Sequence, residues 1–200
     1  SDVPGILEHT RNIIFLEDGE VAIITVGKVE VKKLDGTPVT KRVNTIAWDP
    51  ISAEKGEYRH FMQKEIFEQA RAVTDTLRGR VNFETGEVAL DGLDSWRPNK
   101  IHSVACGTSK NSALVGRFYL ENLARIPTEV DYGSEFRYRD PLIQPGDAIL
   151  GITQSGETAD TLAAMHEAKR RGARTLGLVN VVGSTIARED DGGIYLHAGP

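Results

Sequence analysis

The second half of the chain alternates short β-type runs, most of them rich in apolar residues, with amphipathic stretches. The runs, which predict strands, cover residues 101–105, 128–131, 148–153, 175–179 and 193–196. Helical spacing between them predicts helices over residues 111–123, 158–171 and 184–188, and Gly172 is placed to end the longest one. This alternation is typical of a parallel sheet covered by helices on both faces. We therefore predict an α/β fold built on a five-stranded, doubly wound parallel sheet.

The first 46 residues have a different pattern, in which short β-type segments are separated by glycine-containing turns. Residues 12–16 and 21–26 flank Glu17-Asp18-Gly19-Glu20, which predicts one hairpin. A second hairpin is expected where Asp35-Gly36 separates residues 29–34 from residues 39–43. A sheet this small is marginal on its own in water. We therefore interpret residues 1–46 as a β-hairpin remnant, the last part of a domain whose body lies elsewhere.

Between these two regions the periodicity is first lost and then becomes helical. Residues 47–60 include Asp49-Pro50 and Glu54-Lys55-Gly56 and predict an interdomain connection. Apolar residues then recur at helical spacing from Phe61 to Leu77, and Gly79 supplies a stop signal. The predicted division is thus 1–46, 47–60 and 61–200, with the helix leading into the α/β unit.

The composition of the chain argues against several kinds of binding partner. The chain is 40% hydrophobic and 26% charged, values typical of a globular protein. A net charge of −5 argues against nucleic acid or an anionic membrane as partner. The single cysteine and five scattered histidines predict neither a disulfide nor a metal site. No apolar run approaches the ~18 residues of a membrane span, and no signal peptide is recognisable, so we expect a cytoplasmic protein.

Hydroxyl-rich turns follow two of the predicted strands, where ligands of such sheets bind. The first is Gly107-Thr108-Ser109, and the second runs from Thr153 through Gln154, Ser155, Gly156 and Glu157 to Thr158. Each leads into a predicted helix. The first amides of a helix lack internal acceptors and carry the positive end of its dipole, so they attract phosphate. Serine and threonine hydroxyls add further donors without bulk.

Other roles for these residues remain open at this point. Ser109 and Thr158 could simply cap their helices, which explains either turn alone equally well. The presence of both turns favours phosphate binding. Cys106 suits a buried thiol better than a nucleophile. Lys110 could add positive charge near a phosphate or face solvent, and Glu135 could shape a sugar site or form a surface ion pair with Arg137.

Several motifs resemble one enzyme family in order and spacing. They are Ala105-Cys106-Gly107-Thr108-Ser109, Ser134-Glu135-Phe136-Arg137-Tyr138-Arg139, the segment from Gln154 to Leu162, and Asn180-Val181-Val182-Gly183-Ser184. Together with residues 1–4, 54–56 and 60–69, they resemble the glutamine:fructose-6-phosphate aminotransferase (glucosamine-6-phosphate synthase) family over essentially the whole chain. The resemblance implies that residues 1–46 are the last strands of a glutaminase domain, and residues 61–200 a helix and a first sugar isomerase (SIS) subdomain of flavodoxin-like topology.

The resemblance also implies a ligand and its contacts. Fructose 6-phosphate, or the product glucosamine 6-phosphate, would be held by Thr108, Ser109, Thr153, Gln154, Ser155 and Thr158, with Gly107, Gly156 and Glu135 as further possible contacts. Thr153 stands where the family commonly has serine, which keeps the hydroxyl. No cofactor is implied, and a homodimer is expected.

The family's catalytic groups are not expected within these 200 residues. Its glutaminase uses an N-terminal cysteine, whereas this chain begins with Ser1. The sugar-transforming residues of the family lie in a second SIS subdomain, so this chain alone is expected to be inactive. Two alternatives remain: a SIS-domain sensor of sugar phosphates, and a simple phosphosugar isomerase or deglycase. A sensor would more typically carry a basic helix-turn-helix where this chain has hairpins.

Overall fold

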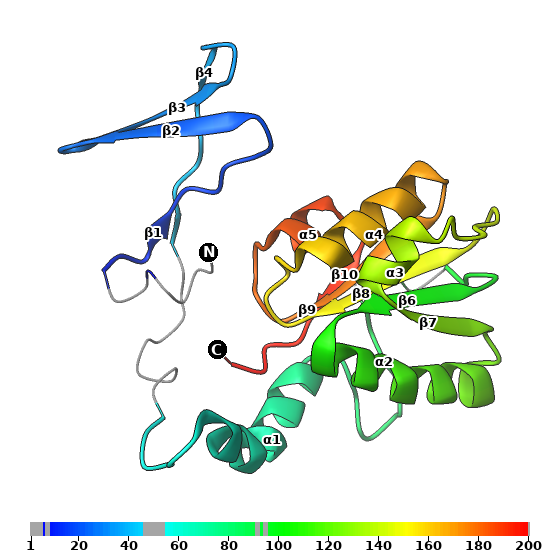
Figure 1. Cartoon of the computed structure of the whole chain (residues 1–200). Coiled ribbons are helices and arrows are strands. Elements are labelled where there is room, and N and C mark those ends of the chain that lie inside the picture. The colour runs from blue at the N-terminus through cyan, green and yellow to red at the C-terminus, as the bar shows by residue number, and fades with distance from the viewer. Residues whose placement is uncertain (1–5, 7–8, 46–54, 91–92, 94–95, 200) are drawn as a thin grey trace. The chain divides into compact units, whose positions relative to one another are not determined.

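The computed structural model describes all residues except 1–5, 7–8, 46–54, 91–92, 94–95 and 200. The chain forms two compact units, Ser1–Glu54 and Lys55–Pro200, which we describe separately (Figure 1). Much of the predicted 47–60 connection, and the opening residues that contribute to the family resemblance, lie outside the described residues. The origin of residues 1–46 in a glutaminase stays a prediction.

The first unit consists of short antiparallel strands. A three-stranded sheet contains β2 (Glu20–Thr25), β3 (Lys28–Lys33) and β4 (Pro38–Val39) in that order, and β1 (Asn12–Ile13) pairs separately with β5 (Asn44–Thr45). Small antiparallel strands before the main domain were expected and are confirmed. The expected hairpin through Asp35-Gly36 forms between β3 and β4.

The other predicted hairpin is wrong in its pairing. β1 does not pair with β2 across the turn at residues 17–20; instead β2 pairs with β3, with Thr25 opposite Lys28. The connection is therefore only two residues long, and its second residue, Gly27, has φ +78°. Glycine adopts this conformation without the steric cost that other residues meet. This two-residue turn joins the two longest strands of the unit, β2 and β3, and so favours their pairing over the pairing of β1 with β2 that the sequence predicted.

The second unit is organised around a five-stranded sheet in the order β10-β9-β8-β6-β7. Its strands are β6 (Ile101–Ala105), β7 (Thr128–Tyr132), β8 (Ala148–Thr153), β9 (Arg174–Val179) and β10 (Gly193–Tyr195). All four pairings are parallel. The predicted α/β fold with a doubly wound parallel sheet is confirmed. Taken in chain order within this sheet, the strands follow the 2-1-3-4-5 arrangement of flavodoxin-like folds.

Helices cover both faces of this sheet (Figure 1). α2 (Gly107–Tyr119), which continues into a π-helical turn at Leu120–Ala124, lies on one face. On the other lie α3 (Gly133–Tyr138), α4 (Ala159–Arg170) and α5 (Thr185–Glu189). α2 begins four residues before its predicted start, so the first hydroxyl-rich segment belongs to the helix itself.

The main core lies between the sheet and α3–α5. Its largest fully buried side chains include Phe136, Ile149 and Ile186. Gly151 of β8 leaves room for the Met165 side chain, since a Cβ there would come within 2.2 Å of the Met165 sulfur and would force that side chain to move. Burial of each large apolar side chain contributes about 1.5–3 kcal/mol. The core thereby holds the strand ends, and the turns that follow them, on a rigid base.

α1 spans Phe61–Leu77, the range predicted from the sequence. Its apolar stripe, however, is not covered by the described part of the chain: Met62, Ile66, Phe67 and Val73 are all more than half exposed. The helix backbone ends where Gly79, at φ +74°, allows the chain to turn. Among the described residues, no helix combines the length and apolarity needed to cross a membrane.

Candidate functional site

The two hydroxyl-rich segments start from neighbouring strands at the same edge of the sheet. β6 and β8 pair in parallel with Ala105 opposite Ile152, so Cys106 and Thr153 come next on adjacent strands. From this edge the chain leaves β6 into α2 on one face and β8 towards α4 on the other. Such a point, where the direction of winding reverses, is where open α/β sheets bind ligands.

The first segment forms the first turn of α2. Cys106 is the N-cap and makes no side-chain capping bond, and Gly107, Thr108 and Ser109 are the first three helical residues. Thr108 is exposed and Ser109 half-buried. Because Ser109 lies inside the helix, the capping explanation does not apply to it. Its hydroxyl stands beside amides that carry the positive end of the helix dipole.

The second segment folds onto its own hydroxyl groups. The buried Thr153 Oγ1 accepts a hydrogen bond from the Gly156 amide at 3.2 Å, and Ser155 Oγ accepts one from the Glu157 amide at 3.2 Å. Thr158 is the N-cap of α4 but makes no capping bond through its side chain; its Oγ1 lies 3.2 Å from Thr153 Oγ1. A hydroxyl that accepts from the backbone keeps its own proton to donate. In the Thr153–Thr158 pair one hydroxyl donates to the other, so the turn offers a ligand the proton of Ser155 and one proton from this pair.

Gly156 is the point at which this turn packs most closely on the rest of the protein. Its φ is +71°, and a Cβ at this position would lie 2.0 Å from the Ser184 Oγ. Both the conformation and the space therefore require glycine. Gln154 is exposed, and its carbonyl accepts hydrogen bonds from the amides of Asn180 and Val181, each at 3.2 Å.

α3 brings further polar residues to the same edge of the sheet. Gly133 lets this helix approach α4, since a Cβ there would lie 2.8 Å from the carbonyl carbon of Asp160. Arg137 Nη1 lies 3.5 Å from Asp160 Oδ1, so its ion-pair partner is on α4 and is not Glu135, which the sequence left open as a partner. Glu135 is exposed in the first turn of α3. Its role in shaping a sugar site stays a prediction.

Two residues with open roles, Lys110 and Cys106, have local partners. The Lys110 ammonium lies 3.6 Å above the Tyr132 ring at the end of β7, the strand on the far side of β6 from β8. It is half-buried by this cation–π contact, so it neither points freely into solvent nor lies between the two turns. Cys106 Sγ lies 3.7 Å from the buried Thr161 Oγ1. This contact suits a packed thiol and provides no base to activate it.

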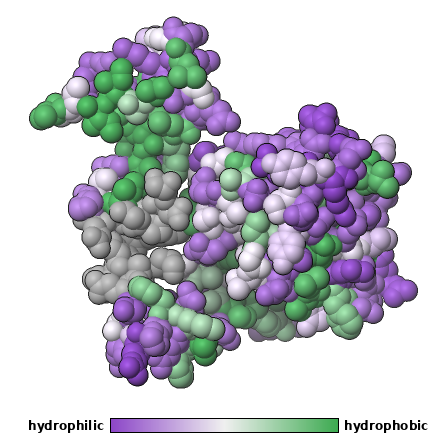
Figure 2. All heavy atoms as spheres, viewed as in Figure 1, coloured by the Kyte–Doolittle hydropathy of each residue, from purple (hydrophilic) through white to green (hydrophobic). Residues whose placement is uncertain are grey.

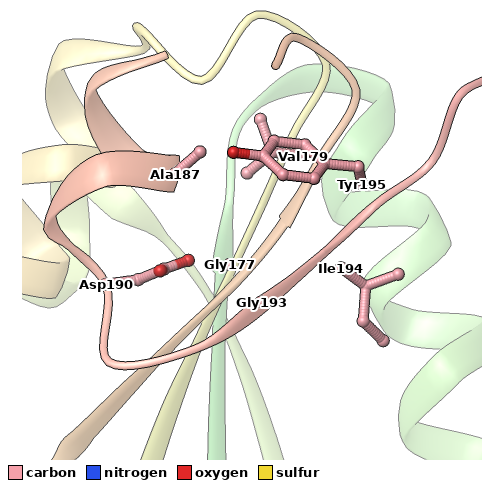
Figure 3. A pocket seen from close by; sticks show the side chains of 7 residues that line it. All are labelled: Gly177, Val179, Ala187, Asp190, Gly193, Ile194 and Tyr195. Atoms are coloured by element: carbon pink, nitrogen blue, oxygen red, sulfur yellow. The ribbon is translucent and has the colours of Figure 1, made fainter. Parts of the chain in front are cut away.

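Sequence reasoning missed two ionisable groups away from this edge, one buried and one half-buried. His102, in β6, is 2% exposed, and burial lowers the pKa of its imidazole despite Asp147 Oδ2 at 3.3 Å from Nε2. Burial, assisted by the nearby Asp191, raises the pKa of Asp190 to about 6. Asp190 adjoins a cavity of about 50 Å³ whose lining is shown in Figure 3: Gly177, Val179, Ala187, Asp190, Gly193, Ile194 and Tyr195. No sequence pattern marked either group.

Metal binding finds no support in the geometry of the described residues. No group of three or more histidine, cysteine, aspartate or glutamate side chains among them is placed to hold a metal ion. The chemistry at the carboxyl edge of β6 and β8 is instead that of hydroxyl and amide donors. Such donors recognise an anion held by hydrogen bonds.

Fold and edge chemistry together define a sugar isomerase type of α/β domain, and residues 96–200 match the SIS domain family model. The chain belongs to the SIS domain family. Over its whole length it is also 47% identical to the glutamine–fructose-6-phosphate aminotransferase (isomerizing) of Chlorobaculum tepidum and 48% identical to that of Aquifex aeolicus. The predicted resemblance is confirmed. The chain spans about a third of the length of these relatives, 33% in both cases.

Solved structures agree with this assignment. The C-terminal domain of glucosamine-fructose-6-phosphate aminotransferase from Francisella tularensis superposes with a TM-score of 0.66 and 35% identity, over 74% of this chain and 43% of that one. A glucosamine-6-phosphate deaminase from Thermotoga maritima superposes with a TM-score of 0.55 over 68% of this chain and 40% of that one, at 20% identity. The second likeness shows the shared fold alone.

Proposed function

We propose that this chain is the sugar-phosphate-binding part of a glutamine–fructose-6-phosphate aminotransferase, which makes glucosamine 6-phosphate from fructose 6-phosphate and glutamine. The observation that carries the proposal is the pair of hydroxyl-bearing turns at the switch point between β6 and β8. Neither Ser109 nor Thr158 caps a helix through its side chain, so capping does not account for them. The 47% identity to aminotransferases over the full chain supplies the substrate.

In this proposal the phosphate lies between the start of α2 and the turn after β8. Thr108 and Ser109 donate from one side, and Ser155 and the hydrogen-bonded Thr153–Thr158 pair, which keeps one proton free, donate from the other. Gln154 contacts the sugar. Backbone amides near Gly107 and Gly156 add donors. The bound sugar is held in place for groups elsewhere in the longer protein, and such positioning supplies several kcal/mol of rate acceleration. The chain itself performs no chemistry in this proposal. The longer protein is a cytoplasmic enzyme that works as a homodimer and uses no cofactor.

A titration with fructose 6-phosphate tests the proposal. The amide signals of Ser109 and Ser155 in the 200-residue chain should shift with fructose 6-phosphate and with glucosamine 6-phosphate, but not with fructose. Signals confined to other parts of the sheet, or none in a folded sample, would contradict the site. Formation of glucosamine 6-phosphate by the chain alone would contradict its proposed lack of activity.

Ser109 provides a variant with a matched control on the same helix. Ser109→Ala removes one charge-assisted hydrogen bond, worth roughly 1.5–3 kcal/mol, so the Kd for fructose 6-phosphate should rise about tenfold or more. Ser112 is exposed one turn further along α2, and Ser112→Ala should leave the Kd unchanged. Equal effects of the two substitutions would argue against a contact at Ser109.

A further inference from the structure

The segment that follows β9 makes backbone hydrogen bonds to the second hydroxyl-rich turn. We call residues 180–186 the clamp segment. Its amides at Asn180 and Val181 donate to the carbonyl of Gln154, and the Ile186 amide donates to the carbonyl of Gly156 at 3.1 Å. The turn itself spans only residues 153–158. Its backbone is therefore tied at two carbonyls to a part of the chain about 25 residues away.

Glu157 adds a side-chain connection to this arrangement. Its Oε1 accepts a hydrogen bond from the Thr185 amide at 2.8 Å, at the start of α5. The same residue donates its own amide to Ser155 Oγ at 3.2 Å. Glu157 thus joins the start of α5 to a hydroxyl of the proposed phosphate site. A hydrogen bond from a backbone amide to a carboxylate is charge-assisted and therefore stronger than one between neutral groups.

A carboxylate next to an anion site requires a physical reason, because like charges repel. Glu157 lies within the turn that would hold the phosphate, between Ser155 and Thr158. Its bond to Thr185 N directs the charge to α5, where the amide compensates it. Direct contact with phosphate cannot explain a glutamate in this turn, because the two charges would repel each other. A role in positioning the backbone of the turn can explain it.

We propose that Glu157 is a positioning residue for the sugar phosphate, acting through the clamp segment and not by touching the ligand. Anchored on Thr185, it fixes the backbone of residues 155–158, so that the hydroxyls of Ser155 and Thr158 are already oriented when phosphate arrives. Pre-organisation of this kind strengthens binding by lowering the ordering cost. The inference rests on the proposed sugar-phosphate site.

Two substitutions at Glu157 separate positioning from simple charge. Glu157→Ala removes both the charge and the acceptor, whereas Glu157→Gln removes the charge and keeps an acceptor oxygen. If charge alone mattered, both variants should bind fructose 6-phosphate as well as the parent or more tightly. Positioning gives the opposite sign: the Kd should rise roughly five- to tenfold in Glu157→Ala and return most of the way in Glu157→Gln. Glu84→Ala, at an exposed site in the loop after α1, is the matched control.

Amide hydrogen exchange without ligand tests the clamp itself. Exchange at Thr185 and Glu157 should be roughly tenfold faster in Glu157→Ala than in the parent or in Glu84→Ala, while β6 and β8 keep their protection. Unchanged exchange at Thr185 would overturn the anchor, and unchanged or tighter binding in Glu157→Ala would overturn positioning. If the parent chain failed to respond to fructose 6-phosphate, the proposed function would fail even where exchange confirmed the anchor, so the two failures are distinguishable.

Discussion

Hydroxyl side chains at the edge of the sheet could be identified from sequence because each apolar run ends directly before them. Thr108, Ser109 and Ser155 all lie at the carboxyl edge, where β6 and β8 end. Their contacts could not be foreseen. The bond between Glu157 and Thr185 joins residues far apart in the chain, and no local pattern reports such a meeting. The role of the hydroxyls in binding phosphate stays a prediction until a ligand is measured.

The half-buried carboxyl of Asp190 makes stability depend on pH. Its folded pKa of about 6 lies above the ordinary aspartate value of 3.8, so the folded state holds this proton more tightly than the unfolded state. Its stabilising contribution is complete below pH ~4 and is lost as pH rises through about 6. Since the group is only half-buried, we expect a loss of roughly 1 kcal/mol rather than the full value of the shift.

Asp190→Asn should remove this part of the pH dependence. The variant and the parent should differ least near pH 4 and most near pH 7.5, where the variant is the more stable by about 1 kcal/mol. Urea unfolding at both pH values measures the difference. A variant that differs from the parent by the same amount at each pH would rule out titration of Asp190 as its cause.

At the scale of elements, the sequence predicted the bounds of those helices and strands whose ends are marked by the periodicity of apolar residues. The bounds of α1 and β8 were predicted to the residue, because an amphipathic stripe and an apolar run define them locally. The pairing of β2 was not, because two glycine-containing turns competed. The start of α2 was placed too late for a similar reason: polar residues such as Asn111 suggest a boundary, but the helix begins at Gly107 directly after Cys106.

Close packing of α3 on α4 depends on Gly133. A Cβ there would lie 2.8 Å from backbone atoms of Asp160, which have no flexible side chain to move aside. Gly133→Ala should therefore force the two helices apart and destabilise the chain by roughly 1–3 kcal/mol. Thermal unfolding, together with the amide signals of residues near Asp160, measures both effects.

Gly116 is the matched control for this substitution. It lies within α2, and a Cβ there would meet nothing within 4 Å. In a helix interior, alanine is favoured over glycine by roughly 0.5–1 kcal/mol, so Gly116→Ala should stabilise the protein. Opposite signs for the two glycines would establish that contact, and not the loss of glycine, determines the outcome. Stabilisation by both would show that α3 has room to move.

At the scale of the whole molecule, the chain leaves much apolar surface uncovered. Apolar residues spread over the small β2–β4 sheet (green in Figure 2), where Ile24 is 76% exposed and Val29 48%. In the second unit the exposed residues of α2 and its π-helical turn include Leu114, Phe118 and Leu123. Soluble monomers rarely leave large continuous apolar patches, and such surfaces mark interfaces. The sequence predicted these residues as helix and strand faces but could not say what covers them.

The homodimer proposed for this protein predicts that a second copy of the chain covers the exposed apolar surface of α2, and this can be tested. Phe118 is 64% exposed, and its ring lies 6.1 Å from that of Tyr119, which is also exposed. If a second copy covers this surface, sedimentation should show a concentration-dependent dimer. Phe118→Asp should then raise the dimer Kd about tenfold or more, because a buried unpaired charge is costly. Phe83→Asp, at a similarly exposed site in the loop after α1, should leave it unchanged. A chain that stays monomeric at high concentration would instead assign this surface to another part of a longer protein.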